Sequence, residues 1–502
     1  MKKVCKPMDI PGIKACRNNC GYIVVFMSLI LLVLMIIVTA VLEIAKLDSG
    51  KTKAAAALST TESDMLAKYQ KLCFERYHLL VCDLSDGGKG EAATEEMMKN
   101  HLQENLGDEL TVDDIAFAGQ EYFLEDDYAE FKKQISDQAY YQAALAAVNA
   151  IETKTGGQDE PVDHDTIQEM DDDVDNTKEV RELEGMEEEE EAEKSGTELV
   201  EKTVDSDVED PRETLKTFTA SGIPALIQPN ELIFSNNQIS QEDDIPSETC
   251  DSSVFSDINT DFDNYTTLKS DTTKENGWGQ SLVNYGEAIA YASSVFNCAT
   301  DVKYDDTYLN LELEYLVGGK PNDADNYESV VRQMIALRLG PNFAYLLTDA
   351  EKMASLEALS TAICAAAPFL QPACKYLLAG CWAYFESVLD VYYLLRGKKI
   401  PYFKDWNSWM TDLEHLGQFQ DAECKEDEDG MSYKDYLMIL IALHGNTIYP
   451  RMLDLIQLNV RQEDIEGGDP NFKFENTVTA FGMDATVSMG ESSFYLHEEA
   501  GY

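Results

Sequence analysis

Carboxylates are the side chains of this sequence that could do chemistry. Asp and Glu number 93 among 502 residues, whereas Lys and Arg number 39 and His six. Two carboxylates can act as general acid and base when the fold holds them at a fixed separation. We single out Glu312 and Glu314, because the segment Asp305 to Leu316 alternates like a strand and would place both at alternating positions beside Tyr315. Without geometry, this pair predicts no particular reaction.

One segment spaces oxygen-bearing side chains like the start of a calcium loop. Phe262 stands where the tight turn of such a loop needs glycine, and Leu268 stands where a bidentate glutamate belongs. We therefore interpret the segment as an ordinary acidic loop. Its alternating residues are Asp257, Asn259, Asp261 and Asp263.

The remaining candidates for catalysis or metal binding are weak. Cys5, Cys16 and Cys20 could approach a metal, but no histidine lies near them. The six histidines show no paired metal-ligand spacing, and the sequence has neither a glycine-rich phosphate loop nor a nucleophile-elbow motif. We therefore expect no enzymatic activity, no cofactor and no metal site.

The formal net charge of −54 restricts the partners. A polyanion of this size repels nucleic acid and anionic lipid surfaces. We therefore expect no nucleic-acid partner. Weak, nonspecific binding of cations is compatible with the charge.

An uncharged stretch near the amino terminus predicts a membrane anchor, which would hold the rest of the chain at the membrane. Residues 21–42, GYIVVFMSLILLVLMIIVTAVL, contain no charge, no proline and no amide side chain. As a helix, they would rise about 1.5 Å per residue and span the ~30 Å hydrocarbon core of a bilayer. We predict a transmembrane helix from Gly21 to Leu42. A cleaved signal peptide is the alternative, but its apolar run would be shorter.

The charges before this stretch predict its orientation. Five basic residues precede it and only Asp9 opposes them, so the positive-inside rule places the amino terminus in the cytoplasm. The protein is then a single-pass protein of the cell membrane, with its bulk outside the cell. The basic residues are Lys2, Lys3, Lys6, Lys14 and Arg17.

Eight cysteines fall on the outer side. Their even number permits disulfides, but their spacing is irregular and their density is far below that of a disulfide scaffold. We favour mostly buried thiols, with one or two disulfides as the alternative. These residues are Cys73, Cys82, Cys250, Cys298, Cys364, Cys374, Cys381 and Cys424.

A stripe of apolar residues continues the helix beyond the membrane. Neither proline nor glycine interrupts residues 54–80, so we predict one helix from Gly21 to Leu80. Four residues recur every seven positions along it: Leu58, Met65, Leu72 and Leu79. The stripe is covered either by the chain's own outer domain or by like helices of other membrane-anchored subunits.

The fold class predicted is a membrane-anchored, mainly α-helical protein with an acidic disordered linker and a carboxyl-terminal α+β domain that has a small antiparallel sheet. The expected segments are a cytoplasmic basic leader (1–20), the transmembrane helix (21–42), an extracellular amphipathic helix and helical region (43–155), the linker (156–215), a loop-rich segment (216–280), the α+β domain (281–490) and a tail (491–502).

Several elements are predicted more closely. Helices are expected at Glu91 to Leu106 and at Glu121 to Thr153, and the strand-like FKFENTVTAFGMDATVSM is expected to pair with a strand near Tyr308. The run ACKYLLAGCWAYFESVLDVYYLL could be a second membrane span. Its charges, Lys375, Glu386 and Asp390, favour a buried core helix instead.

Two families resemble parts of this sequence. The leader ending in Gly21, the apolar run and its Lys- and Ala-rich continuation resemble the amino end of TadE/TadG-like proteins of tight-adherence pilus systems. Residues 51–83, with YLNLELEYLVGGK, RQMIALRLGPNFAYLLTD and YPRMLDLIQLNVRQ nearer the carboxyl terminus, more closely resemble an uncharacterised family of single-pass proteins of Gram-positive anaerobes, whose genes are typically associated with such machinery. True pilins carry a glutamate at the fifth position after the leader, where this chain has Phe26. The resemblance therefore implies an accessory subunit rather than a polymerising pilin.

Two functions follow as expectations. The first is a non-enzymatic, pseudopilin-like accessory component of a pilus or secretion assembly, with the lipid bilayer at residues 21–42 and other membrane-anchored subunits as partners. The alternative is a membrane-anchored extracellular binding or enzyme module of unknown ligand.

Overall fold

The structure is a computed structural model that describes residues 19–155, 222–240, 243–249, 278–413, 416, 424–463 and 465–502. The expectations for most of the basic leader, for the linker 156–215 and for the calcium-like segment 257–268 fall outside the described residues. The chain forms two compact units. Unit 1 comprises Met1–Glu75, Leu79–Glu125 and Asp469–Tyr502, and unit 2 comprises Arg76–His78 and Asp126–Gly468.

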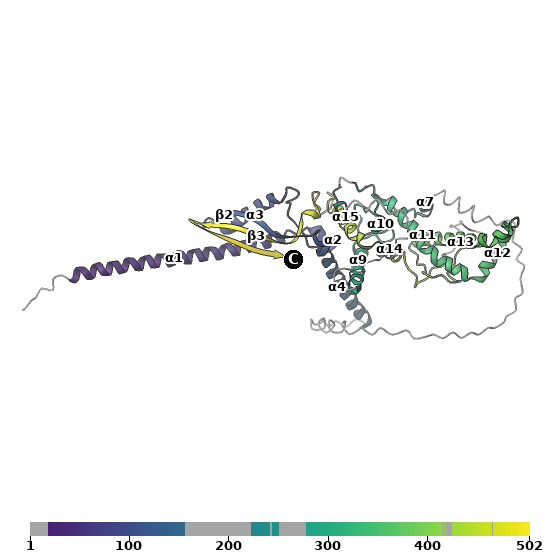
Figure 1. The fold of residues 1–502 in the computed structure, drawn as a ribbon, viewed down its shortest axis with the longest axis horizontal. Helices are drawn as coiled ribbons and strands as arrows, with labels where there is room; N and C mark the ends of the chain where they lie inside the picture. Colours follow the sequence, from purple (N-terminus) through teal and green to yellow (C-terminus); the bar gives the residue numbers. More distant parts are fainter. Residues whose placement is uncertain are drawn as a thin grey trace, which may run out of the picture. The chain divides into compact units, whose positions relative to one another are not determined.

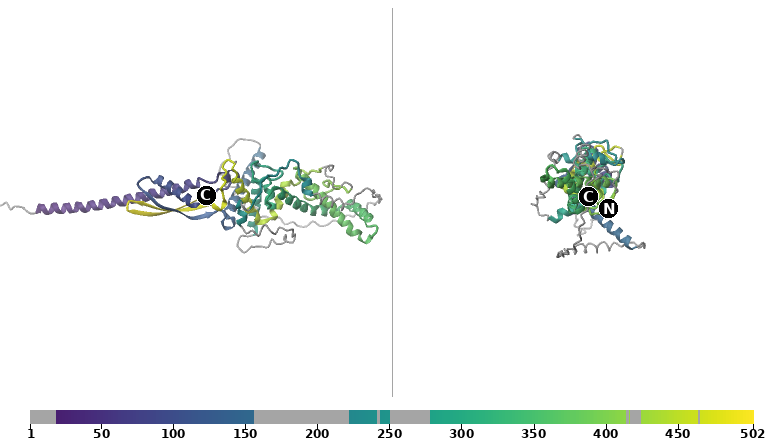
Figure 2. Two further views of the ribbon diagram at one scale, coloured as in Figure 1. Left: turned by 90° about the horizontal axis from the view of Figure 1, so that it is seen from above. Right: turned by 90° about the vertical axis from the view of Figure 1, so that its right-hand side faces the viewer.

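Unit 1 is built on α1 (Asn19–Leu66), a helix of 48 residues. Every side chain from Ile23 to Lys46 is exposed, and this half of α1 stands clear of the strands of its own unit (Figure 1; Figure 2). Among the described residues, α1 is the one helix long and apolar enough to cross a membrane. The predicted long apolar helix at the amino terminus is thus confirmed.

The second half of α1 packs against a four-stranded antiparallel sheet. The sheet has the order β1–β3–β2, and β4 also pairs with β3. Val112 lies opposite Val487 between β2 and β3, and Met483 lies opposite Glu498 between β3 and β4. The strands are β1 (Cys82–Asp83), β2 (Thr111–Tyr122), β3 (Thr477–Met489) and β4 (Ser492–Gly501).

One apolar core joins the sheet to two helices. Alternate residues of β3 point into this core, as expected of a strand with one covered face. They meet Leu58 and Met65 of α1 and three residues of α3 (Glu91–Leu106) that recur every fourth position, on one face of that helix. The predicted bounds of the helix Glu91 to Leu106 are confirmed. The strand residues are Phe481, Met483, Ala485 and Val487, and those of α3 are Met98, Leu102 and Leu106.

A glycine sets how closely α1 and β3 approach. Gly50 is the first buried residue of α1, and a Cβ there would lie 3.0 Å from Met489 Sδ. The missing side chain lets the end of β3 lie against the helix backbone. The packed half of α1 therefore begins at Gly50.

The prediction of one helix from Gly21 to Leu80 is wrong. α1 ends at Leu66, where the amides of Lys68 and Tyr69 bond back to the Met65 and Leu66 carbonyl oxygens at 2.9 and 3.2 Å. A new helix, α2 (Lys71–Tyr77), begins with the Gln70 side chain accepting a hydrogen bond from Cys73 N at 2.9 Å. The turn after Leu66 and the cap at Gln70 separate two helices, although the seven-residue spacing of the apolar stripe suggested one continuous helix.

The predicted partner of the terminal strand is also wrong. β3 pairs with β1, β2 and β4, whereas Tyr308 lies in no strand. Residues 492–501, expected in a tail, form β4, and Glu121, expected in a helix, lies in β2. The small antiparallel sheet therefore exists, but it belongs to unit 1 and not to a domain spanning 281–490.

The secondary structure of the described part of unit 2 is helical, apart from two isolated bridges that involve Cys298 and Ile400, and irregular loops connect the helices. Its α13 is the helix that resembled a second membrane span. Glu386 and Asp390 are buried in it, and its apolar side packs with α11 and α12 around Trp382. The helices are α4 (Glu125–Thr155), α7 (Ile223–Ile227), α8 (Pro246–Thr249), α9 (Trp278–Val295), α10 (Glu312–Gly318), α11 (Asp323–Thr348), α12 (Ala350–Ile363), η3 (Pro368–Leu370), α13 (Gln371–Leu394), α14 (Tyr433–Leu443), η4 (Gly445–Thr447) and α15 (Ile448–Val460).

Truncation of Leu58 should loosen unit 1. Leu58 is fully buried, so Leu58→Ala removes core contacts and leaves a cavity, which typically costs about 2–5 kcal/mol. We expect faster hydrogen exchange of the β3 amides in this variant. Ser59→Ala, one residue along on the exposed side of α1, is the control and should leave exchange unchanged. Equal exchange in both variants would show that the sheet does not depend on α1.

Candidate functional site

The four residues of the predicted stripe are all buried. Leu58 and Met65 lie in the core of unit 1, Leu72 lies in α2, and Leu79 follows α2; none is more than 5% exposed. The described residues of the chain therefore already cover this stripe. The predicted anchor ends are both in α1, with Gly21 near its start and Leu42 in its exposed half.

Glu312 and Glu314 do not lie on a strand. Both belong to α10, whose seven residues are all buried, so the alternation that suggested a strand is absent from the burial. Glu312 accepts hydrogen bonds from Asn297 N at 2.8 Å and from Asn459 Nδ2 at 2.6 Å. Burial raises the pKa of each carboxyl to about 7.

The surroundings of these carboxyls are structural. Glu314 Oε1 accepts hydrogen bonds from Ala299 N and from the Tyr433 hydroxyl, both at 2.9 Å. The Tyr315 hydroxyl donates to Asp454 Oδ2 at 2.8 Å, and burial raises the pKa of Asp454 to about 6. These hydrogen bonds join α10 to α14 and α15, and the groups that make them are inaccessible to solvent.

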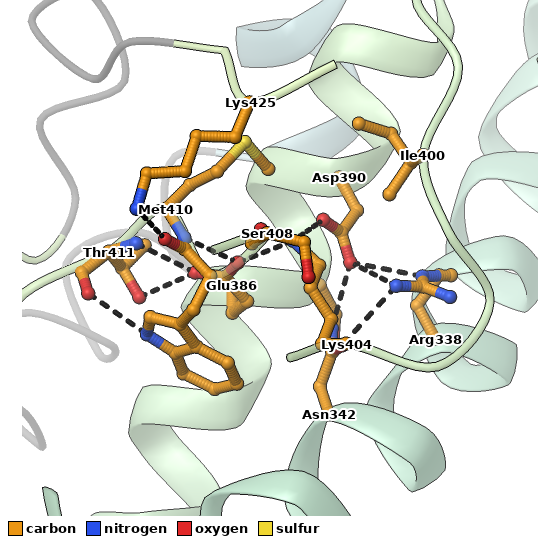
Figure 3. A network of polar contacts seen from close by, with 12 residues as sticks. Arg338, Asn342, Glu386, Asp390, Ile400, Lys404, Ser408, Met410, Thr411 and Lys425 are labelled. Atoms are coloured by element: carbon orange, nitrogen blue, oxygen red, sulfur yellow. Dashed lines mark hydrogen bonds and ion pairs between the residues drawn. The ribbon is translucent and has the colours of Figure 1, made fainter. Parts of the chain in front are cut away.

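A second set of buried charges forms a network of ion pairs (Figure 3). Its four members, Arg338, Glu386, Asp390 and Lys404, have completely buried side chains. Lys404 Nζ lies 2.6 Å from Glu386 Oε1 and 2.7 Å from Asp390 Oδ1, and Arg338 Nη2 lies 2.9 Å from Asp390 Oδ2. Burial alone would raise the pKa of Asp390, but Lys404 and Arg338 lower it. Two cations thus balance two anions inside the unit.

This ion network fixes a loop, residues 400–411, to α13. Glu386 accepts hydrogen bonds from the backbone N–H groups of Met410 and Thr411 at 2.9 and 2.8 Å. Lys404 Nζ donates to Ser408 O at 2.9 Å, and Arg338 Nη1 donates to the Tyr402 carbonyl at 2.6 Å. The backbone of the loop is therefore held along its length by buried charges.

The fixed loop presents two aromatic side chains to solvent. Phe403 is 77% and Trp406 is 70% exposed, although buried Lys404 lies between them. Asp405 and Ser408 close the turn reciprocally, with Asp405 N donating to Ser408 Oγ at 2.7 Å and Ser408 N donating to Asp405 Oδ1 at 2.8 Å. The Ser408 hydroxyl, which donates to Asp405 Oδ1 at 2.6 Å, and Ser408 N lower the pKa of Asp405. Exposed aromatic rings on a fixed backbone are a feature of binding surfaces.

Sequence reasoning missed this loop. Its signal was the density of aromatic residues in YFKDWNSW, residues 402–409, which is too short and irregular for a helical or strand pattern. No sequence pattern would have placed Lys404 against Glu386 and Asp390, because that requires the packing of the loop on α13.

The cysteines whose side chains the structure describes form no disulfide with one another. Cys73, Cys82, Cys298, Cys374 and Cys381 are buried, which is the arrangement favoured from the sequence. In the same residues, no three His, Cys, Asp or Glu side chains are placed to hold a metal ion. Cys5, Cys16, Cys20 and Cys250 fall outside this comparison.

Comparison with known families gives one match. The family described as a family of unknown function, DUF5702, matches residues 201–489, which is more than half of the chain. The chain therefore belongs to this family. No curated protein and no solved structure matches the chain.

Loss of the buried cation should be far more damaging than loss of a surface one. In Lys404→Met, Glu386 and Asp390 lose a shared partner inside the unit, and breaking a buried pair typically costs about 3–5 kcal/mol. Chemical denaturation measures this loss of stability, and hydrogen exchange of the α13 amides locates it. Lys398→Met removes an exposed ion pair with Glu426 and should have little effect. Similar effects of the two substitutions would contradict a structural role for the ion network.

Unit 2 should be more stable in mild acid than at alkaline pH. Glu312 and Glu314 have a raised pKa of about 7 in the folded chain, against about 4.5 when unfolded. The folded chain therefore keeps protons that the unfolded chain releases, so the free energy of unfolding falls as pH rises from about 4.5 to about 7 and then levels off. Denaturation at several pH values should show this slope, and Glu314→Gln should reduce it by about one proton's contribution. An unchanged slope in the variant would contradict the raised pKa.

Proposed function

We propose that this family member is a single-pass cell-surface protein, anchored by α1 with its amino terminus in the cytoplasm. We further propose that it is a non-enzymatic accessory subunit of a pilus-like, tight-adherence assembly. One observation carries the proposal: α1 is exposed and apolar in its first half and packed against its own sheet in its second half.

The first half of α1 is suited to an apolar environment and not to water. Large apolar side chains from Ile23 to Leu42 are exposed, and each would gain roughly 1.5–3 kcal/mol on full burial. A bilayer supplies that burial, and a helix satisfies its own backbone polar groups there. A signal peptide would supply the same apolar run, but it would not continue as a packed helix to Leu66.

The packed second half determines where other subunits could bind. Leu58 and Met65 are already covered in the core of unit 1, so they are not available to a partner helix. Association with other membrane-anchored subunits would therefore use residues 23–42, which are exposed on all sides. Small residues are few in this stretch, so such contacts would rest on apolar side-chain packing.

The loop with Phe403 and Trp406 favours the second candidate, an anchored extracellular binding module. Its aromatic rings are exposed on a backbone that buried ion pairs hold in place, so little conformational entropy would be lost on binding. The two candidates are compatible, because an accessory subunit can also bind a ligand. Neighbouring genes distinguish them cheaply: an assembly ATPase and polytopic platform proteins would favour the first.

Photo-cross-linking from α1 tests the proposal in cells. A photoreactive phenylalanine analogue in place of Phe26, which is 64% exposed, should give adducts with lipid and with other single-span proteins. Replacement of Leu31 and Leu34 by Lys should release the chain from washed membranes, because charges at the bilayer centre are costly. Adducts with lipid alone would contradict the accessory-subunit role and leave the anchor standing. A chain found without its leader in the soluble fraction would contradict the anchor.

A further inference from the structure

A second apolar surface lies at one end of unit 2. α12 and α13 pack side by side and are joined through η3, and we call residues 358–377 the hairpin end (Figure 1). Four large apolar side chains are exposed there: Phe369 (81%), Leu370 (49%), Tyr376 (55%) and Leu377 (54%). Small apolar residues fill the surface around them, including exposed Ala362, Ala365 and Ala366.

The hairpin end is uncharged in a strongly acidic chain. Residues 358–374 contain no Asp, Glu, Lys, Arg or His, although the chain carries a net charge of −54. The first charges on the two arms, Glu357 and Lys375, pair with each other, with Lys375 Nζ 2.9 Å from Glu357 Oε2. The two charges that border the surface therefore neutralise each other, and covering the surface would not desolvate an unpaired charge.

Several polar groups of the hairpin end have hydrogen-bond partners within it or in Glu357 at its border. The Ser360 and Thr361 hydroxyls donate to the Glu357 carbonyl at 2.9 and 2.8 Å, and Gln371 Nε2 donates to Ser360 Oγ at 3.2 Å. Within the turn, Ala367 N donates to Cys364 O at 2.8 Å and Leu370 N donates to Ala367 O at 3.0 Å.

Two prolines reduce the number of backbone donors further. Pro368 and Pro372 have no N–H group at the positions where a helix start would leave one unpaired. These features suit an environment that offers no hydrogen bonds. A surface facing water gains nothing from them, because water would satisfy the same groups.

We propose that the hairpin end inserts into the interfacial region of a zwitterionic phospholipid bilayer, since the net charge of −54 repels anionic lipid surfaces. Phe369 and Leu370 would enter the acyl boundary, and Tyr376 would keep its hydroxyl among the headgroups while its ring is covered. The neutral Glu357–Lys375 pair would lie at headgroup level. A charged partner is disfavoured because the surface has no charge to offer it, and a second copy is disfavoured because two chains of −54 repel each other.

A tether makes such a shallow contact effective. A few inserted side chains give only weak, reversible binding on their own. A chain already held at the membrane meets the bilayer at a high effective concentration, so a weak second contact becomes populated. Only this strengthening rests on the anchor proposed above, and the inference is independent of the pilus-like assembly.

Site-specific photolabelling tests the contact in the full-length chain. The chain carrying a photoreactive phenylalanine analogue at position 369 is reconstituted in phosphatidylcholine vesicles that contain a fluorescent phosphatidylcholine, and is then irradiated. The matched control carries the analogue at position 403, because Phe403 is about as exposed and lies elsewhere in the same unit. We expect lipid labelling at least about tenfold stronger from position 369 than from position 403.

A double substitution tests whether the apolar surface causes the labelling. Leu370→Asp with Leu377→Asp should reduce labelling from position 369 to the level of position 403, while denaturation curves stay unchanged because both leucines are exposed. Leu443→Asp, at an exposed leucine of α14, should leave the labelling intact. Equal lipid labelling from 369 and 403, or chain-to-chain adducts without lipid adducts from 369, would overturn the proposal. A chain that fails to enter vesicles at all would contradict the anchor, which is a separate result.

Discussion

The second half of α1 has to be covered, and β3 and β4 cover it together with α3. Beyond its exposed apolar stretch, α1 turns Ala54, Leu58 and Met65 inward, and these side chains need a packed surface. β3 and β4 provide part of that surface, and β3 is hydrogen-bonded to β1, β2 and β4, so one strand organises the whole sheet. Gly50 sets the point at which exposure changes to packing. The difference between the two halves of α1, on which the functional proposal rests, follows from this contact.

Unit 2 buries acidic groups in two physically different ways. Lys404 and Arg338 lie against Asp390 and lower its pKa, Glu386 pairs with Lys404, and the resulting network holds a loop in place. Burial raises the pKa values of Glu312, Glu314 and Asp454 towards neutrality, and the hydrogen bonds that these carboxyls accept offset only part of that rise. Removal of one partner of a buried ion pair is costly, whereas the whole pair contributes little net stability, which favours a role for the network in positioning the loop.

The sequence allowed prediction of the elements with simple patterns. The apolar half of α1 followed from composition, and the bounds of α3 followed from good helix formers between glycine-rich turns. β2 was missed because register shifts at Asp114 and at Glu121 interrupt its alternation. α10 resembled a strand because all its residues are buried, which leaves no helical period to read. The partner of β3 and the Lys404 network depend on contacts between distant segments, which no local pattern contains.

The strands of the sheet come from sequence segments on both sides of unit 2, which affects folding during synthesis. α1, α3 and β2 precede unit 2 in the chain, whereas β3 and β4 follow it. During translation, Leu58 and Met65 therefore lack the β3 and β4 part of their cover until the segment after unit 2 leaves the ribosome. A chain terminated after Gly468 but before Thr477 would contain every residue of unit 2 and none of β3. A nonsense mutation in this interval would therefore disrupt the sheet that packs on α1 and leave unit 2 complete.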